Sequence, residues 1–103
     1  MTERRIEVLF FDECPNADLA ADHARAAVRA AGVAATLTLV PVRNDEEAQR
    51  LRFLGSPTVR VDGQDVDPTA ATRHDFGMQC RVYRVNGRLE GAPPSEWIAA
   101  ALR

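Results

Sequence analysis

The chain has 103 residues, a length typical of one domain, which we take to span residues 1–103. Hydrophobic residues make up 46% and charged residues 27% of it, the balance of an ordinary globular protein. The net charge of −2 lacks the basic excess that nucleic-acid binding requires, and no stretch approaches the ~20 apolar residues of a membrane span. The polar start predicts no leader. We therefore expect a cytoplasmic protein without nucleic-acid or membrane partners, and the sequence leaves its oligomeric state open.

The first part of the chain predicts a β-α-β unit. Residues 5–11 form an apolar run that is typical of a central strand. Residues 15–31 carry an apolar stripe at spacings of three and four, with Pro15 suited to the first helical position and Gly32 to the end. Residues 35–40 then alternate as a second strand. This order predicts two parallel strands joined by a right-handed crossover.

The middle of the chain predicts a short helix and a third strand. Asn44 followed by Glu47 resembles a capping box, and Gly55 is expected to end the helix that it opens. Residues 56–63 predict a third strand, which begins at Pro57 and ends in the Asp62–Gly63 turn. Residues 64–79 show no periodicity, so we expect a long loop with at most one helical turn, and such loops are often functional.

The last part predicts a strand and a helix. Residues 80–85 alternate and precede an Asn-Gly turn, and a helix that carries Trp97 follows Pro93. The full order is β-α-β-α-β-β-α. It predicts an α/β fold with a central mixed four-stranded sheet and helices on both faces.

Cys14 is the strongest candidate for chemistry. It follows the first strand and precedes Pro15, so we expect its sulfur at a helix N-terminus, where free N–H groups favour thiolate. The dipole contributes only about 0.3–1 kcal/mol, and the nearby carboxylates Asp12, Glu13 and Asp18 oppose it. A moderately reactive thiol is therefore expected. The alternative is a cysteine that serves only packing.

Two segments, together with the element order, resemble the thioredoxin family. One is residues 11–17, FDECPNA, and the other is residues 55–59, GSPTV, which is similar to the family's cis-proline segment. The resemblance implies a thioredoxin-like fold over nearly the whole chain and a cis Ser56–Pro57 bond beside the cysteine. It also implies a substrate site lined by Pro15, Ser56, Pro57 and Thr58.

The chain departs from that family at Ala17, where thioredoxins have their second cysteine. Without that thiol, Cys14 must act alone, use a low-molecular-weight thiol, or find a resolving partner elsewhere. Cys80 is the only other cysteine, and two cysteines 66 positions apart form no disulfide framework, so free thiols are expected.

The strand register decides whether Cys80 can reach Cys14. In a simple hairpin Cys80 lies opposite Asp62, about 16 Å along the strand from Pro57. That is too far for a disulfide, whose Cα atoms lie within about 7 Å of each other. A shift of four residues would instead place Cys80 beside Ser56, within reach of Cys14. The long preceding loop leaves both registers open.

The tail resembles the C-terminal part of organomercurial (alkylmercury) lyases through residues 80–83, CRVY, and residues 95–97, SEW. Those enzymes contain a thioredoxin-like domain and use two cysteines and an aspartate. The resemblance implies Cys14 and Cys80 as mercury ligands, since soft thiolates suit a soft metal. The aspartate would be Asp12, Asp18 or Asp75, although none of them has the spacing found in the lyases.

Three functions follow as expectations. The leading one is an oxidoreductase activity, thiol–disulfide chemistry through Cys14 on a disulfide substrate or a low-molecular-weight thiol. The second is binding or cleavage of mercury compounds by Cys14 and Cys80. The third is a non-catalytic interaction module. None of them requires a resident cofactor or metal.

The remaining polar residues are weaker candidates. His74, in the long loop, could carry a proton or bind a metal, whereas His23 is expected on the surface. The acidic residues of the same region lack the spacing of a calcium loop and predict a solvated loop. These are Asp62, Asp65 and Asp67. Tyr83 and Trp97 are expected in the core.

Overall fold

The computed structural model describes residues 3–103, so Met1 and Thr2 of the polar start lie outside the described residues. Its elements are β1 (Arg4–Phe10), α1 (Ala17–Ala31), β2 (Ala35–Pro41), α2 (Asp45–Arg50), β3 (Thr58–Val61), β4 (Gln64–Asp65), the 3₁₀ helix η1 (Pro68–Thr72), β5 (Tyr83–Val85), β6 (Arg88–Glu90) and α3 (Ser95–Leu102). Within this described part, none of the helices combines the length and the apolar character needed to cross a membrane.

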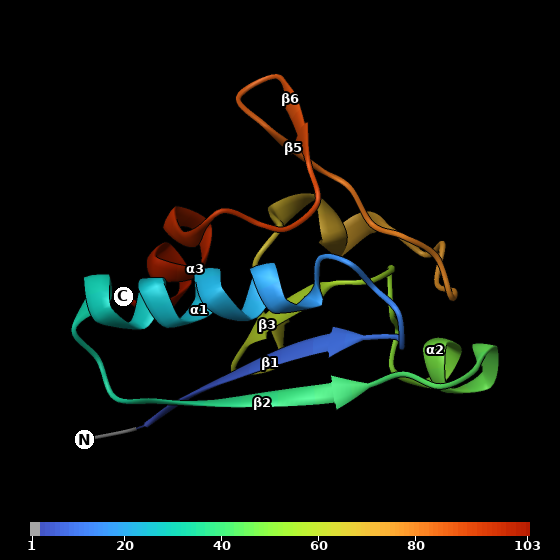
Figure 1. Cartoon of the computed structure of the whole chain (residues 1–103), viewed down its shortest axis with the longest axis horizontal. Helices are drawn as coiled ribbons and strands as arrows, with labels where there is room; N and C mark the ends of the chain where they lie inside the picture. Colours follow the sequence, from blue (N-terminus) through green and yellow to red (C-terminus); the bar gives the residue numbers. More distant parts are fainter. Residues whose placement is uncertain (1–2) are drawn as a thin grey trace.

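A mixed four-stranded sheet in the order β2-β1-β3-β4 forms the centre of the molecule. β1 pairs in parallel with β2, and β3 pairs antiparallel with both β1 and β4. The predicted β-α-β unit is therefore confirmed, with α1 lying across β1 and β2 (Figure 1). β1 is central because it is apolar on both faces: Val8 is fully buried on one face and Leu9 almost so on the other.

α1 and α3 pack together on one face of the sheet (Figure 1). α1 presents small buried side chains, including Ala20, Ala24 and Ala27, which allow its backbone to lie close to the strands. Ile98 of α3 completes the layer. This is the main hydrophobic core, and the sheet contributes to it through Ile6, Val8, Val59 and Val61.

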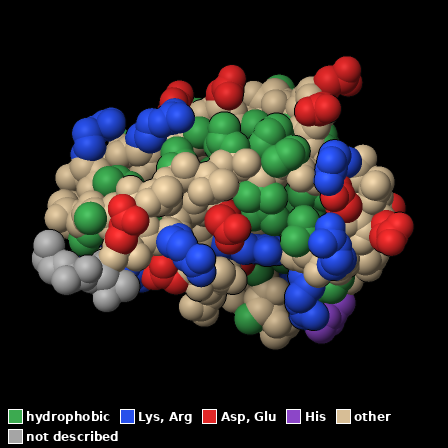
Figure 2. All heavy atoms as spheres, turned by 90° about the horizontal axis from the view of Figure 1, so that it is seen from below, with side chains coloured by type: hydrophobic (Ala, Val, Ile, Leu, Met, Phe, Trp, Pro, Cys, Tyr) green, Lys and Arg blue, Asp and Glu red, His purple; other side chains and the backbone are tan. Residues whose placement is uncertain are grey.

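A smaller hydrophobic cluster lies on the other face, beneath one end of the sheet. It is formed by Leu9, Val42, Ala48 and Phe53. α2 contributes Ala48 and so covers only this end. Figure 2 shows this side of the molecule, where hydrophobic side chains are bordered by charged ones.

Residues 80–85 do not supply the fourth strand of the sheet, and that prediction is wrong. β4 fills this place, directly after the Asp62–Gly63 turn. Only residues 83–85 form a strand, and it pairs with β6 across the Asn86–Gly87 turn in a hairpin outside the sheet (Figure 1). Both turn residues have positive φ, 52° and 79°, as a two-residue hairpin requires. Because of this turn, β5 pairs with β6 and does not join the central sheet.

The end of α1 and the start of α2 lie where the sequence predicted them, but α2 ends earlier than predicted. Gly32 ends α1 with φ +66°, and the Asn44 side chain accepts the Glu47 N–H at 2.8 Å at the start of α2. α2 ends at Arg50 rather than near Gly55, because Arg52 is left-handed and the Phe53 N–H returns to the Ala48 carbonyl at 2.8 Å. Residues 64–79, expected as a loop with at most one helical turn, contain the unexpected strand β4 and one short helix, η1.

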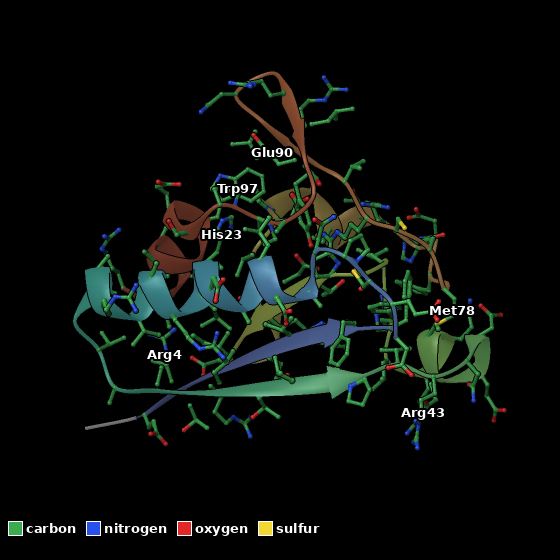
Figure 3. All side chains as sticks on the ribbon, in the orientation of Figure 1. Arg4, His23, Arg43, Met78, Glu90 and Trp97 are labelled. Carbon is green, nitrogen blue, oxygen red and sulfur yellow. The ribbon has the colours of Figure 1, made fainter. Side chains whose placement is uncertain are left out.

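Arg4 fastens the last helix to the first strand. Its guanidinium donates to the Leu102 and Ala101 carbonyls at 3.0 and 2.9 Å and also pairs with Asp62. These carbonyls have no intrahelical partner because they lie at the end of α3. The start of β1 and the end of α3 therefore lie together, at the left of the molecule in Figures 1 and 3.

We expect Gly55→Ala to destabilise the protein much more than Gly32→Ala. Gly55 has φ +125°, and an added Cβ would lie 2.9 Å from the Gln79 carbonyl oxygen, whereas nothing lies within 4 Å at Gly32. Strain and overpacking together predict a loss of ~2–5 kcal/mol at Gly55, against ~1–2 kcal/mol at Gly32. Chemical denaturation measures both losses. Equal losses would show that Gly55 does not need its close contact.

Candidate functional site

Cys80 lies beside Ser56. The two residues form an isolated parallel bridge, in which the Ser56 N–H donates to the Gln79 carbonyl at 2.9 Å and the Arg81 N–H donates to the Ser56 carbonyl at 3.0 Å. The simple hairpin register is wrong. Cys80 does lie beside Ser56, where the shifted register would have placed it, but through a single parallel bridge and not through an antiparallel strand pair. The bridge brings an exposed thiol to the residue directly before Pro57.

Cys14 lies in the turn between β1 and α1, not at the helix N-terminus. α1 begins at Ala17 with Asn16 as its N-cap, so Pro15 is not the first helical residue and the predicted position of the sulfur is wrong. The cause is an extra turn of chain, in which the Cys14 N–H donates to the Phe11 carbonyl at 3.3 Å and its carbonyl accepts the Ala17 N–H at 3.5 Å. The thiol is half-buried and free.

Ser56 connects the two cysteine segments. Its hydroxyl oxygen accepts the Phe11 N–H at 3.3 Å, and Phe11 holds the Cys14 turn through its carbonyl. Its backbone holds Cys80 on the other side. Neither cysteine is in a disulfide, Cys14 is half-buried and Cys80 is exposed, so the expectation that Cys80 packs in the core does not hold. The site is therefore a pair of accessible thiols on segments that meet at one serine.

Hydrogen bonds from buried side chains hold the segment around Pro57 in place. The Ser56–Pro57 bond is cis, as predicted, and the Pro57 carbonyl accepts the Tyr83 hydroxyl at 2.5 Å. Thr58 is fully buried, and its hydroxyl donates to the Gly55 carbonyl at 2.6 Å and accepts from Arg81 at 3.0 Å. Thr58 therefore fixes the segment, whereas Pro15, next to Cys14 in the chain, is exposed.

A cavity of about 330 Å³ adjoins the thiol segments. Its lining includes Asp12, two residues before Cys14, and Met78, two residues before Cys80. Phe11, Val42 and Arg43 complete the lining. Figure 3 shows Arg43 and Met78 at the same end of the molecule, far from Arg4. Neither cysteine lines this cavity, whose walls are apolar apart from Asp12 and Arg43.

The other predicted polar candidates do not gather at the thiols. Asp75 pairs with Arg73 at 2.6 Å, and this guanidinium holds the pKa of the carboxyl below its usual value. His74 is exposed and meets the Phe76 ring edge-on, while His23 is half-buried with Nδ1 2.8 Å from the Pro93 carbonyl oxygen. Among residues 3–103, no three His, Cys, Asp or Glu side chains are grouped to hold a metal ion.

Arg81 is the residue that sequence reasoning missed. Its side chain is 1% exposed, pairs with Asp65 at 2.7 Å and Asp67 at 3.5 Å, and lies 4.6 Å from the centre of the Tyr83 ring. The prediction of a solvated acidic loop is therefore wrong for Asp65 and Asp67, because a buried guanidinium draws both carboxylates inward. A weak signal was present, since Arg81 shares a strand face with the apolar Tyr83 and follows two unassigned aspartates.

Arg81 positions Cys80. Its guanidinium ties residues 80–83 to Thr58 of β3 and Asp65 of β4, where no regular strand pairing does so. Hydrogen bonds to charged groups are roughly twice as strong as neutral ones, so these bonds hold the segment firmly. The neighbouring thiol is thereby kept beside Ser56.

No protein-family model, curated protein or solved structure matches this chain. The resemblances to thioredoxins and to organomercurial lyases are therefore neither supported nor contradicted by known proteins. The chemistry of the site rests on its own geometry.

Tyr83 predicts a loss of stability in alkaline solution. Burial raises the pKa of its hydroxyl well above the usual value of about 10, although the charge of Arg81 acts in the opposite direction. Above pH ~10 the unfolded chain releases this proton while the native protein keeps it, so the free energy of unfolding falls as pH rises.

Tyr83 is the only tyrosine in the chain, so tyrosinate absorbance reports on this residue alone. We expect native protein to show no tyrosinate near pH 10 and Tyr83→Phe to lose this component of the pH dependence in denaturation curves. Tyrosinate that forms at the usual pH in the folded protein would contradict the prediction.

Proposed function

We propose that this chain is a thioredoxin-like thiol protein that carries out thiol–disulfide exchange with Cys14 and Cys80. The observation that carries the proposal is the position of Cys80 alongside Ser56, whose hydroxyl binds the segment that holds Cys14. Two accessible thiols on adjoining segments can replace the closely spaced pair that Ala17 rules out.

The arrangement of elements supports a thioredoxin-like fold. A parallel β1-α1-β2 unit precedes the antiparallel strands β3 and β4, and α3 packs beside α1. Pro57, at the start of β3, adjoins the thiol segments, as the resemblance implies. The short β4 and the separate β5–β6 hairpin are features of this chain.

The exchange proceeds in two displacements. The Cys14 thiolate attacks one sulfur of the substrate disulfide, the substrate S–S bond breaks, and the leaving thiolate takes up a proton. The Cys80 thiolate then attacks the Cys14 sulfur, which forms a Cys14–Cys80 disulfide and releases the second substrate thiolate. The substrate gains two electrons, and the protein loses two. A low-molecular-weight thiol returns the protein to its reduced form.

Peptide mapping after mild oxidation tests this mechanism. We expect monomeric wild-type protein to form an intramolecular Cys14–Cys80 disulfide, which requires Cα atoms within about 7 Å. We expect Cys80→Ser to trap a stable mixed disulfide at Cys14 with a small disulfide such as oxidised glutathione.

Cys14→Ser is the matched control, because it removes the attacking thiol and leaves Cys80 in place. We expect it to lose exchange activity, with little mixed disulfide at Cys80. The proposal fails if oxidation links only separate molecules, or if Cys14 reacts no faster than a free peptide thiol.

The same pair is also arranged to bind mercury, which is the second candidate function. Thiolates are preferred ligands of soft metals, and these two lie on segments that meet at Ser56. Of the three aspartates considered from the sequence, only Asp12 lines the adjoining cavity. In carbon–mercury cleavage, the Asp12 carboxylate would take up a proton that a cysteine thiol releases on binding mercury and pass it to the carbon as that bond breaks, which leaves the metal on the two thiolates.

Mercury titration tests the second candidate. We expect one equivalent of Hg²⁺ per chain, seen as mercury–thiolate absorbance, and a much weaker complex in Cys14→Ser and in Cys80→Ser. Asp12→Asn should retain mercury binding and lose any release of hydrocarbon from an organomercurial. Unchanged binding in both cysteine variants would refute a shared site.

A further inference from the structure

A second cavity, of about 290 Å³, lies between the loop after α2, strands β3 and β4, and residues 68–76. It shares no lining residue with the cavity beside the thiols. Its walls combine apolar side chains with guanidinium groups, namely Leu51, Leu54, Phe76, Arg52, Arg60 and Arg73.

Arg60 is half-buried in this cavity without a carboxylate partner. Its Nη2 donates to the Leu51 and Arg52 carbonyls at 2.7 and 3.1 Å, and no Asp or Glu of residues 3–103 lies within ion-pair distance. Burial lowers its pKa, since the charged form loses solvent. A guanidinium has five N–H donors, so it retains capacity for an anion beyond these two carbonyls.

Arg52 is held at the rim of the same cavity. Its guanidinium carbon lies 5.0 Å from the centre of the Phe76 ring, a cation–π geometry. Its backbone has φ +56°, which is uncommon for a residue other than glycine. In residues 3–103 it too lacks an acidic partner within ion-pair distance.

The acidic residues of this region are already engaged. Asp65 and Asp67 line the cavity, but their carboxylates bind the buried Arg81 and nearby backbone N–H groups. Arg73 is engaged with Asp75. Glu7 lies opposite Arg60 in the β1–β3 register, and its charge, with that of Asp65, acts on the guanidinium without an ion pair. Arg52 and Arg60 are therefore the arginines of this region that have no direct ion pair among residues 3–103. Figure 2 shows basic side chains gathered at the right-hand end of the face it presents.

We propose that this cavity binds a small organic monocarboxylate. The carboxylate lies between the Arg52 and Arg60 guanidinium groups, which match its planar geometry, and the apolar body packs against Leu51, Leu54 and Phe76. The carboxylates around the two guanidinium groups would repel a phosphate dianion more strongly than a monoanion, which favours a ligand with a single negative charge. The volume lies near the lower limit of ligand sites, so the ligand is small.

Titration of the full chain with benzoate, followed by amide NMR shifts, tests the proposal. We expect saturable shifts confined to residues 51–54, 60 and 68–76. We also expect binding to weaken with added salt and to be absent with benzamide, which has the same shape without the charge. Equal binding of benzamide, or tighter binding of inorganic phosphate, would overturn the assignment to a monocarboxylate.

Two variants and a matched control locate the site. Arg60→Met and Arg52→Met should each weaken benzoate binding at least tenfold, and Arg52 is exposed, so its variant should fold even if the Arg60 variant does not. Arg88→Met, on the separate hairpin, should bind as wild type does. Unchanged affinity in Arg52→Met, or an equal loss in Arg88→Met, would refute the site. Cys14→Ser should bind benzoate normally, which separates this result from the thiol chemistry.

Discussion

The ion pairs of buried Arg81 hold together the parts of the molecule that no continuous sheet connects. The guanidinium joins Asp65 and Asp67 of the long loop to Thr58 of β3, and the backbone of the same residue bonds to Ser56. Removing one partner from such a cluster leaves an uncompensated buried charge, which typically costs ~3–5 kcal/mol. The loop, the proline segment and the Cys80 segment therefore depend on one side chain for their mutual placement.

This dependence explains how a small domain can build a site from segments far apart in sequence. The Cys14 turn is fixed by the end of β1, while Cys80 is fixed by Arg81, and Ser56 lies between them. Each link uses backbone groups that would otherwise be left without partners. The hydrogen bonds that pair the backbone groups of this region are therefore the same bonds that bring the two cysteine segments together.

Most of the helices and strands could be predicted from signals that lie within a few residues of one another in the sequence. The apolar run of β1, the stripe of α1, the Asn44 cap and the Asn86–Gly87 turn each act within a few residues, so the sequence alone indicates them. The two-residue strand β4 has no such signal, because it is too short to show alternation. Its absence from the prediction led to the misplacement of residues 80–85.

The site was less predictable, because its geometry depends on contacts distant in sequence. The register of Cys80 is set by Gln79 and Arg81 against Ser56, and nothing local to Cys80 specifies it. The extra turn that separates Cys14 from α1 is held by the hydrogen bonds of Cys14 to Phe11 and to Ala17, and no residue type in this stretch signals it in advance. The proline segment was recognised only through resemblance, since a proline at the start of a strand is common.

The clasp between Arg4 and the final carbonyls of α3 has a consequence for the topology of the chain. The first strand and the last helix meet there, so the path of the backbone is nearly a closed ring. A short peptide could join the start of β1 to the end of α3, and the chain could be opened instead in the exposed tip of the β5–β6 hairpin. The architecture is therefore suited to circular permutation, with the cysteine segments left intact.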